Sequence, residues 1–307
     1  MAIVKTDAPM TYGLCEETIL ALLERYPFFR SEVLTRTAFG RNLRTLVIGT
    51  GPRKVIYSAS HHANEWITTS ILLKFAEELA AAMESGGEIF GVDARMLSET
   101  ATIYMVPMVD PDGVDLVTGA IEPGAPVYEV AQSLAEHYPA IPFPDGWKAN
   151  LLGVDLNLQY PAGWCRAREI KFAQGFTRPG PRDFVGRGPL TQRESRALAG
   201  YTEFVDPALV LAYHSQGKEI YWQFQDMEVP GARELGEELA RVSGYRLAET
   251  PYASSFAGYK DWFIEKFRRP GYTIEVGEGV NPLPLSQFQE IYRDNLGILV
   301  TAAIWGS

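Results

Sequence analysis

Three of the four histidines in this 307-residue sequence stand where apolar, β-rich runs end. His61 and His62 follow one such run, and His214 follows a second. A third run carries Glu275 at its end. Ligands of open α/β sheets bind outside the carboxyl ends of the strands, so we expect these side chains to lie close together.

The spacing of His62 and Glu65 is that of a metal-ligand pair, HxxE, and His214 would supply a distant third ligand. Two imidazoles and one carboxylate, with a fourth position left to water, are typical of catalytic zinc. A carboxylate outside the ligand set must then take a proton from water and deliver it to the leaving amine, and Glu275 could do this. His61 lies four residues from Glu65, so spacing alone leaves His61 and His62 as rival ligands.

Apolar runs and amphipathic helices alternate along the chain and would position these residues. This alternation predicts a largely parallel sheet covered on both sides, in one three-layer α/β/α domain over residues 1–307 with a mostly parallel, mixed central sheet. The polar stretch 110–190 is longer than an ordinary connecting loop, and we expect it to carry functional residues. The predicted strands are 44–49, 54–60, 101–109, 207–214 and 271–276. The predicted helices are 16–26, 66–83, 191–204, 231–244 and 286–306.

The charge balance is acidic, with 28 Lys and Arg against 38 Asp and Glu and a net charge of −10. Phosphate binding needs a concentrated basic face, so this balance argues against nucleic acid as a partner. The sequence has no apolar run of signal-peptide or membrane-span length, from which we expect a cytoplasmic protein without a membrane partner. Cys15 and Cys165 are interpreted as buried thiols of a reducing compartment, with a single bridge between them left open.

Five motifs, in their order along the chain, resemble those of the zinc metallocarboxypeptidase family. The family order of the motifs is kept and they span most of the sequence, so the resemblance implies a carboxypeptidase-like fold. The motifs are HANEW at 62–66, DPDG at 110–113, GVDLN at 153–157, HS at 214–215 and TIEVGEG at 273–279.

The resemblance implies roles for individual residues. It implies one Zn²⁺ per chain, held by His62, Glu65 and His214, and it selects His62 over the histidine before it. It implies that Glu275 is the base that activates the attacking water. Asp155, in GVDLN, resembles the partner that orients a zinc-ligating imidazole.

Three positions depart from the family pattern. Leu158 stands where other members have an arginine that clamps the C-terminal carboxylate of the substrate, and leucine cannot form a bidentate ion pair. Asp110 replaces the usual asparagine, a change that the sequence does not explain. Lys148, after Trp147, stands about where an arginine usually steadies the oxyanion, and we predict that it takes this role.

The segments HHANEWITTS and GVDLNLQYPAGW are similar to one bacterial branch, the γ-D-glutamyl-diamino acid peptidases of peptidoglycan metabolism. Their bond joins the side-chain carboxyl of D-Glu to diaminopimelate or lysine, so no standard C-terminal clamp is expected. The resemblance implies that Asn157, Tyr252 and Lys260 bind substrate. A cation at Lys260 would suit a diaminopimelate carboxylate, with an ordinary exposed lysine as the alternative, and Tyr259 is the rival of Tyr252.

The sequence therefore predicts a zinc metallopeptidase that hydrolyses the γ-D-glutamyl–diamino acid bond of peptidoglycan-derived peptides, with a muropeptide as partner. An internal role, such as turnover of imported muropeptides, is the expectation. A zinc carboxypeptidase or amidase acting on other peptides is the first alternative. A catalytically inactive, metal-free, peptide-binding member is the second, although a binding module has no need of a general base such as Glu275.

Overall fold

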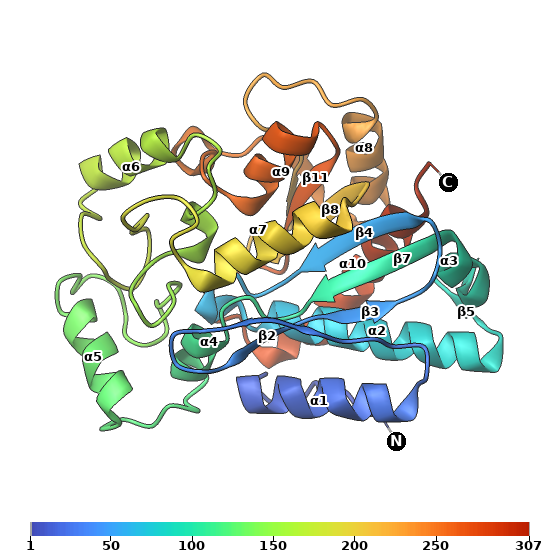
Figure 1. The fold of residues 1–307 in the computed structure, drawn as a ribbon, viewed down its shortest axis with the longest axis horizontal. Coiled ribbons are helices and arrows are strands. Elements are labelled where there is room, and N and C mark those ends of the chain that lie inside the picture. The colour runs from blue at the N-terminus through green and yellow to red at the C-terminus, as the bar shows by residue number, and fades with distance from the viewer. Residues whose placement is uncertain (1, 307) are drawn as a thin grey trace.

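A seven-stranded mixed sheet runs through the centre of the molecule (Figure 1). The computed structural model describes residues 2–306. The sheet has the order β10-β9-β11-β8-β4-β7-β3. Neighbours are parallel except at β3–β7 and β9–β11. The strands are β3 (Leu46–Ile48), β4 (Arg53–Ser58), β7 (Ala101–Val106), β8 (Leu209–His214), β9 (Glu219–Tyr221), β10 (Arg246–Ala248) and β11 (Gly271–Glu275). The predicted mixed, mostly parallel sheet is confirmed.

Alternate residues of the central strands pack into different layers, because successive side chains of a strand point to opposite faces. Val55 and Tyr57 of β4 belong to the hydrophobic core that the sheet shares with α2 and α10. Ile56, between them, belongs to the core shared with α7 and α9. Figure 1 shows these helices on opposite sides of the sheet. Burial on both faces explains why the strands are continuous apolar runs in the sequence.

The five helices predicted from hydrophobic periodicity are present as α1, α2, α7, α8 and α10, whereas α9, which also packs on the sheet, was not predicted. The α-helices are α1 (Tyr12–Arg25), α2 (Ile67–Ser85), α3 (Ala94–Thr100), α4 (Pro111–Val117), α5 (Pro126–Ala135), α6 (Trp164–Ala173), α7 (Arg193–Val205), α8 (Ala232–Ser243), α9 (Tyr259–Phe267) and α10 (Phe288–Ile304). Single 3₁₀ turns are η1 (Ala63–Glu65), η2 (Leu156–Leu158), η3 (Tyr252–Ser254) and η4 (Leu285–Gln287). Two small ribbons pair β1 (Val33–Arg36) with β2 (Asn42–Arg44), and β5 (Glu88–Ile89) with β6 (Val92–Asp93).

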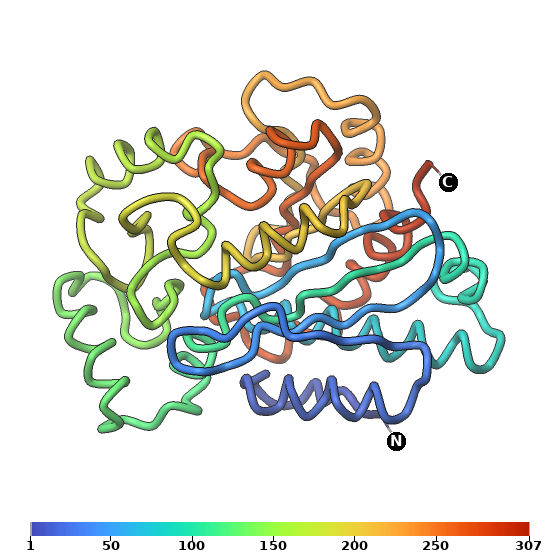
Figure 2. The backbone as a smooth tube through the Cα atoms, in the orientation of Figure 1, coloured from blue at the N-terminus to red at the C-terminus, as the bar shows by residue number. Residues whose placement is uncertain are grey.

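The chain between α4 and α7 gathers beyond the carboxyl ends of β4 and β7, where the arrowheads of these strands point (Figures 1 and 2). This segment contains α5 and α6 but is otherwise irregular. It lies at the sheet edge where the predicted chemistry gathers, as expected of a long segment that carries function.

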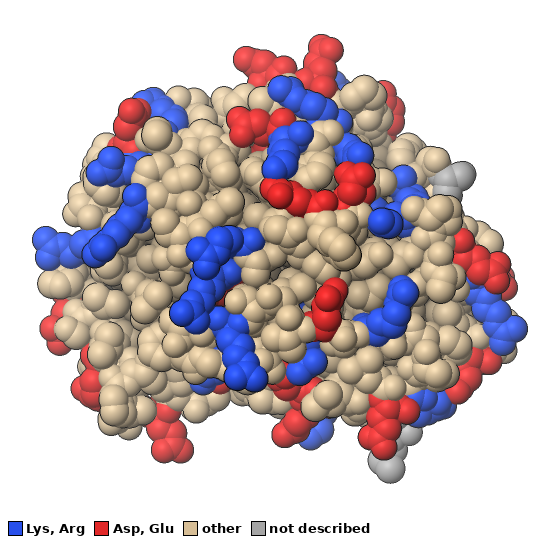
Figure 3. Space-filling model, viewed as in Figure 1, with Lys and Arg blue, Asp and Glu red and all other residues tan. Residues whose placement is uncertain are grey.

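Charged side chains of both signs are scattered over the face drawn in Figure 3. Among residues 2–306 no helix is long and apolar enough to cross a membrane. Both cysteines are free, so no bridge joins them. Cys15 is buried, as predicted, whereas the prediction of a buried thiol is wrong for Cys165, which is exposed.

Candidate metal centre

His62, Glu65 and His214 come together at the carboxyl ends of the neighbouring strands β4 and β8. After β4 the chain turns into η1, which carries Glu65 at its last position. His214 is the last residue of β8. The ends of two adjacent strands therefore bring His214 next to Glu65, which lies 149 residues away in the sequence.

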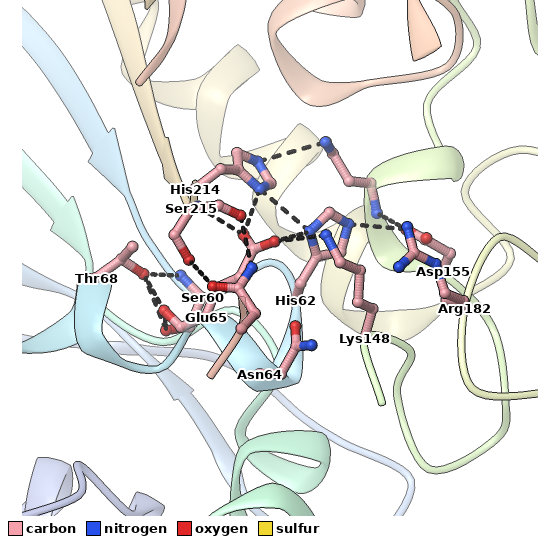
Figure 4. Close-up of polar contacts among 12 residues, drawn as sticks. Ser60, His62, Asn64, Glu65, Thr68, Lys148, Asp155, Arg182, His214 and Ser215 are labelled. Atoms are coloured by element: carbon pink, nitrogen blue, oxygen red, sulfur yellow. Dashed lines mark hydrogen bonds and ion pairs between the residues drawn. The ribbon is translucent and has the colours of Figure 1, made fainter. Parts of the chain in front are cut away.

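The three side chains aim their donor atoms at one another (Figure 4). Nδ1 of His62 lies 3.0 Å from Oε1 of Glu65, and Nδ1 of His214 lies 2.9 Å from Oε2. The two Nδ1 atoms are 3.3 Å apart, and one ligand atom from each residue lies within 4.8 Å of the others. Two imidazole nitrogens and one carboxylate, held this close, fit a zinc ion. In the described part of the chain this is the one such group of His, Cys, Asp and Glu side chains.

Both imidazoles are fixed from the far side of the ring by residues of the GVDLN segment. Oδ1 of Asp155 lies 3.2 Å from Nε2 of His62, and Nδ2 of Asn157 lies 3.4 Å from Nε2 of His214. Oδ1 of Asn157 accepts a hydrogen bond from the backbone N–H of Tyr259 at 3.0 Å. The amide of Asn157, which the resemblance assigns to substrate, is thus already engaged with a metal-site histidine.

His61, the rival of His62, is not part of this group. Its ring is fully buried and stacks between His214 and Tyr259, with centroids 5.5 Å from each. Burial, together with the neighbouring histidines, holds the pKa of His61 well below its ordinary value, which keeps the ring neutral. Geometry therefore separates the two histidines that spacing left open.

Lys148 lies beside the group, with its Nζ 2.7 Å from Oε1 of Glu65 (Figure 4). Burial alone would raise the pKa of Glu65, but Lys148, His62 and His214 outweigh it and bring that pKa well below its ordinary value. Burial alone would lower the pKa of Lys148, but the negative charge of Glu65 outweighs burial and raises that pKa above its ordinary value. A charged ammonium therefore stands next to the candidate metal.

Glu275 faces the same space from β11, which pairs with β8 so that Glu275 and His214 are register partners. The residue belongs to the lining of the cleft and is not one of the three grouped side chains. Burial and the nearby Glu65 carboxylate raise the pKa of Glu275 to about 8, against the opposing effect of Lys148 and His62. A carboxyl whose pKa lies near neutral pH can both accept and donate a proton.

A cleft of about 740 Å³ opens over this centre. Leu158 belongs to its lining but is buried, with 7% of its surface exposed, and offers no charge. Lys260 also belongs to the lining, yet its side chain is only 4% exposed. Its ammonium already has partners, Oδ1 of Asp261 at 2.7 Å and the carbonyl oxygen of Gln223 at 2.6 Å. Lys260 is therefore neither an exposed lysine nor a free cation.

The two rival tyrosines lie in different surroundings. The side chain of Tyr252 is exposed at η3, next to the cleft residue Pro251, and its hydroxyl accepts a hydrogen bond from Nε of Arg166 at 3.1 Å. Tyr259 is fully buried, and its hydroxyl lies 2.8 Å from Oγ1 of Thr202 in the core. Tyr259 belongs to the lining of the cleft, but its hydroxyl is engaged in the core. Tyr252 is exposed and does not belong to the lining, although Pro251 and Ser254 on either side of it in the sequence do.

The DPDG motif is structural, and its geometry explains the unusual Asp110. Oδ1 of Asp110 accepts from the N–H of Gly113 at 3.0 Å, whereas the buried Oδ2 has no partner in the described residues. A Cβ at Gly113 would lie 2.3 Å from Oδ2, so only glycine fits. Burial, with the carboxylates of Glu194 and Asp112, raises the pKa of Asp110 well above its ordinary 3.8. The neutral acid resembles the family's asparagine in shape and charge.

Asp110→Asn should therefore stabilise the protein increasingly as pH rises. Unfolding exposes a carboxyl that ionises above its ordinary pKa of 3.8, while the folded carboxyl stays protonated, so stability from this group is lost as pH rises toward the folded pKa. Asparagine removes this loss, which is at most about 1.4 kcal/mol per pH unit. Urea unfolding of both proteins at pH 5 and at pH 8, both above the ordinary pKa of 3.8, measures it. A gain that is the same at both values, or larger at pH 5, would contradict this account.

Arg182, a cleft residue that lies near Lys148 and Asp155 in Figure 4, was not predicted from the sequence. It stands in the loop Pro179-Gly180-Pro181-Arg182-Asp183, within the segment expected to carry function. An arginine beside an aspartate in a Pro- and Gly-rich loop is a weak signal, because no periodicity fixes where such a side chain points.

Comparisons with known proteins agree with this geometry. The zinc carboxypeptidase family model matches residues 15–297. Gamma-D-glutamyl-L-diamino acid endopeptidase 1 of Lysinibacillus sphaericus is 42% identical over 291 residues, which cover 94% of this chain and 71% of that protein. An uncharacterised protein of Bacillus subtilis is 38% identical over 286 residues, 92% of this chain and 74% of that protein. Bovine thrombin-activatable fibrinolysis inhibitor matches 97% of each chain with a TM-score of 0.73 at 15% identity. The expected carboxypeptidase-like fold is confirmed.

Proposed function

Since the chain belongs to the zinc carboxypeptidase family, we propose that it hydrolyses the bond between the γ-carboxyl of D-glutamate and a diamino acid in peptidoglycan-derived peptides. The chain is a zinc metallopeptidase, and muropeptides are the proposed substrates. The observation that carries the proposal is the 42% identity to a γ-D-glutamyl-L-diamino acid endopeptidase over 94% of this chain. The diamino acid is meso-diaminopimelate or lysine.

His62, Glu65 and His214 would hold the zinc ion, one per chain. When bound, zinc polarises a carbonyl and lowers the pKa of a water molecule toward about 7. Asp155, 3.2 Å from His62, and Asn157, 3.4 Å from His214, would keep the two rings turned toward the ion. The role of Asn157 is then to position a ligand rather than to touch the substrate.

Glu275 would accept a proton from the attacking water and deliver it to the leaving amine. The register pairing of Glu275 with His214 supports this role, because it brings the carboxyl to the cleft beside the metal group without making it a ligand. Lys148 would stabilise the negative charge that develops on the scissile carbonyl oxygen. Its ammonium, 2.7 Å from Glu65, is close enough to the centre to do so.

Lys148→Ala should lower kcat about a hundredfold and raise KM much less, since a group that meets the oxyanion acts mainly in the transition state. Lys148→Arg should keep most of the activity, because it keeps the cation. Steady-state kinetics on L-Ala-γ-D-Glu-L-Lys would measure both variants. Lys148 also pairs with Glu65, so the zinc content of each variant has to match that of the wild type. A rise in KM with kcat unchanged would remove Lys148 from this role.

The cleft supports a substrate without a standard C-terminal clamp. Leu158 has no charge, and the ammonium of Lys260 is held by Asp261 and Gln223. A peptidase that trims ordinary C-terminal residues needs a cation for the terminal carboxylate. We retain Tyr252 as a residue that closes over the substrate, because its exposed side chain follows the cleft residue Pro251 and precedes the cleft residue Ser254. We assign Lys260 to the packing of the pocket wall.

The test offers L-Ala-γ-D-Glu-meso-diaminopimelate to the zinc-loaded protein and identifies the products by mass spectrometry. The proposal predicts L-Ala-D-Glu and free diaminopimelate. Release of alanine, by cleavage of the α-linked L-Ala–D-Glu bond, would contradict it and would favour a peptidase of other peptides. Protein treated with a chelator serves as the blank.

A further inference from the structure

Four lysine and arginine side chains belong to the lining of the cleft, and the three lysines each pair with a carboxylate. Nζ of Lys148 lies 2.7 Å from Glu65, Nζ of Lys171 lies 2.6 Å from Asp183, and Lys260 is buried against its own partners. The side chains of these lysines are 17%, 9% and 4% exposed, respectively. Lys171 and Lys260 are therefore nearly buried against their own partners, and Lys148 already has its proposed role at the oxyanion.

Arg182 is different, because only one edge of its guanidinium is used. Its Nε donates to Oδ2 of Asp183 at 2.6 Å, and its side chain is 40% exposed. In the described part of the chain neither Nη atom has a hydrogen-bond partner. The two remaining nitrogens thus leave an open fork in the cleft, the geometry that binds a carboxylate through two parallel hydrogen bonds.

The loop that carries Arg182 is tied to the catalytic groups on both sides. The carbonyl oxygen of Pro181 accepts from the backbone N–H of Lys148 at 2.7 Å. The backbone N–H of Asp183 donates to Oδ2 of Asp155, the carboxylate that orients His62, at 3.2 Å. Lys171 holds the same Asp183 that holds Arg182. These contacts position the loop of Arg182 relative to the metal centre, and Figure 4 shows Arg182 beside Asp155.

The proposed substrate carries carboxylates beside the bond that is cut. Linkage through the γ-carboxyl leaves the α-carboxylate of D-glutamate free, and the diamino acid brings a carboxylate of its own. We propose that Arg182 binds one of these carboxylates bidentately and so takes over substrate recognition that Leu158 cannot provide. This inference rests on the function proposed above, and it assigns the specificity for γ-linked peptides to Arg182.

The first experiment compares Arg182→Gln, Arg182→Lys and the wild type on L-Ala-γ-D-Glu-meso-diaminopimelate. Arg182→Gln should raise KM about ten- to a hundredfold, the scale of a lost charged hydrogen bond, with kcat nearly unchanged. Arg182→Lys should recover only part of this, because an ammonium lacks the fork. Arg187→Gln is the matched control, since Arg187 is an exposed arginine of the same loop that does not line the cleft.

The second experiment removes the carboxylates from the substrate. One peptide has the D-glutamyl α-carboxylate amidated, and the other has the carboxylates of the diamino acid amidated. The amide that abolishes the difference in KM between wild type and Arg182→Gln identifies the carboxylate that Arg182 binds.

Two outcomes would overturn the inference. One is an Arg182→Gln variant that matches the wild type, and the other is a difference in KM that neither amide removes. If the wild type cleaves the γ-linked peptide in either case, the proposed function stands and only the role of Arg182 falls. If the wild type cleaves none of the peptides, the proposed function itself fails, and the inference fails with it.

Discussion

Replacing Glu275 with glutamine should lower kcat at least about a hundredfold, the usual scale of general acid–base catalysis, while the bound zinc is unchanged. Glutamine keeps the size and hydrogen-bonding shape of the side chain but cannot accept the proton of the attacking water. Glu275 lies outside the group of His62, Glu65 and His214, so its loss leaves the three donors in place. Zinc analysis and kcat, measured on the same preparation, test both halves of this prediction.

Glu278→Gln is the matched control for Glu275→Gln. Glu278 lies three residues further along, is exposed, and does not line the cleft. The control should retain the activity of the wild type. Full activity of Glu275→Gln together with loss of activity in Glu278→Gln would move the base to Glu278, and loss of zinc in Glu275→Gln would contradict the separation of base and ligands.

His62→Gln should abolish zinc binding and with it the activity. Even partners that only orient a ligand contribute about ten- to a hundredfold to metal affinity, so loss of a ligand should cost more. We expect less than about 0.2 zinc per chain after dialysis, against about one for the wild type, because His62 is one of only three protein ligands of the candidate site. The activity should fall to that of the chelated wild type.

His61→Gln separates the metal site from its surroundings. His61 is the other histidine of the pair and stacks on His214, but it is not part of the metal group. The variant should keep its zinc. Equal loss of zinc in His61→Gln and His62→Gln, with circular dichroism that matches the wild type, would contradict the assignment of His62 alone as a ligand.

The sheet could be predicted from the sequence because strands buried on both faces are continuous apolar runs. The β4 and β8 segments are continuous apolar runs, and both lie at the centre of the sheet with helices on either side. The short strands β9 and β10, of three residues each at one end of the sheet, were not predicted. So short a run has too few side chains to show a period, and it forms because a neighbouring strand offers free backbone groups.

The grouping of His62, Glu65 and His214 could be predicted because ligands of open α/β sheets bind at the carboxyl ends of the strands, where distant residues meet. The choice between His61 and His62 could not be made from spacing, since it depends on the turn between β4 and η1. Lys260 illustrates the same limit. Its charge is visible in the sequence, but its burial against Asp261 and Gln223 depends on tertiary packing.

Leu158 and Arg182 show what a motif can and cannot reveal. The motif shows that the arginine that would clamp the substrate's carboxylate is replaced by Leu158. It does not show which cation replaces it, because Arg182 comes from an irregular loop whose path depends on backbone contacts to Lys148 and Asp155. Loop geometry of this kind leaves no periodic pattern in the sequence.

The central claim is tested most directly by a ratio of kcat/KM values for two isomeric peptides. L-Ala-D-Glu-L-Lys is made once with the lysine on the γ-carboxyl and once with it on the α-carboxyl, so that the two differ only in linkage. The zinc-loaded protein should prefer the γ-linked isomer by at least about a hundredfold, since a carboxylate moved away from its binding group is left unpaired. Equal rates, or a preference for the α-linked isomer, would contradict the account.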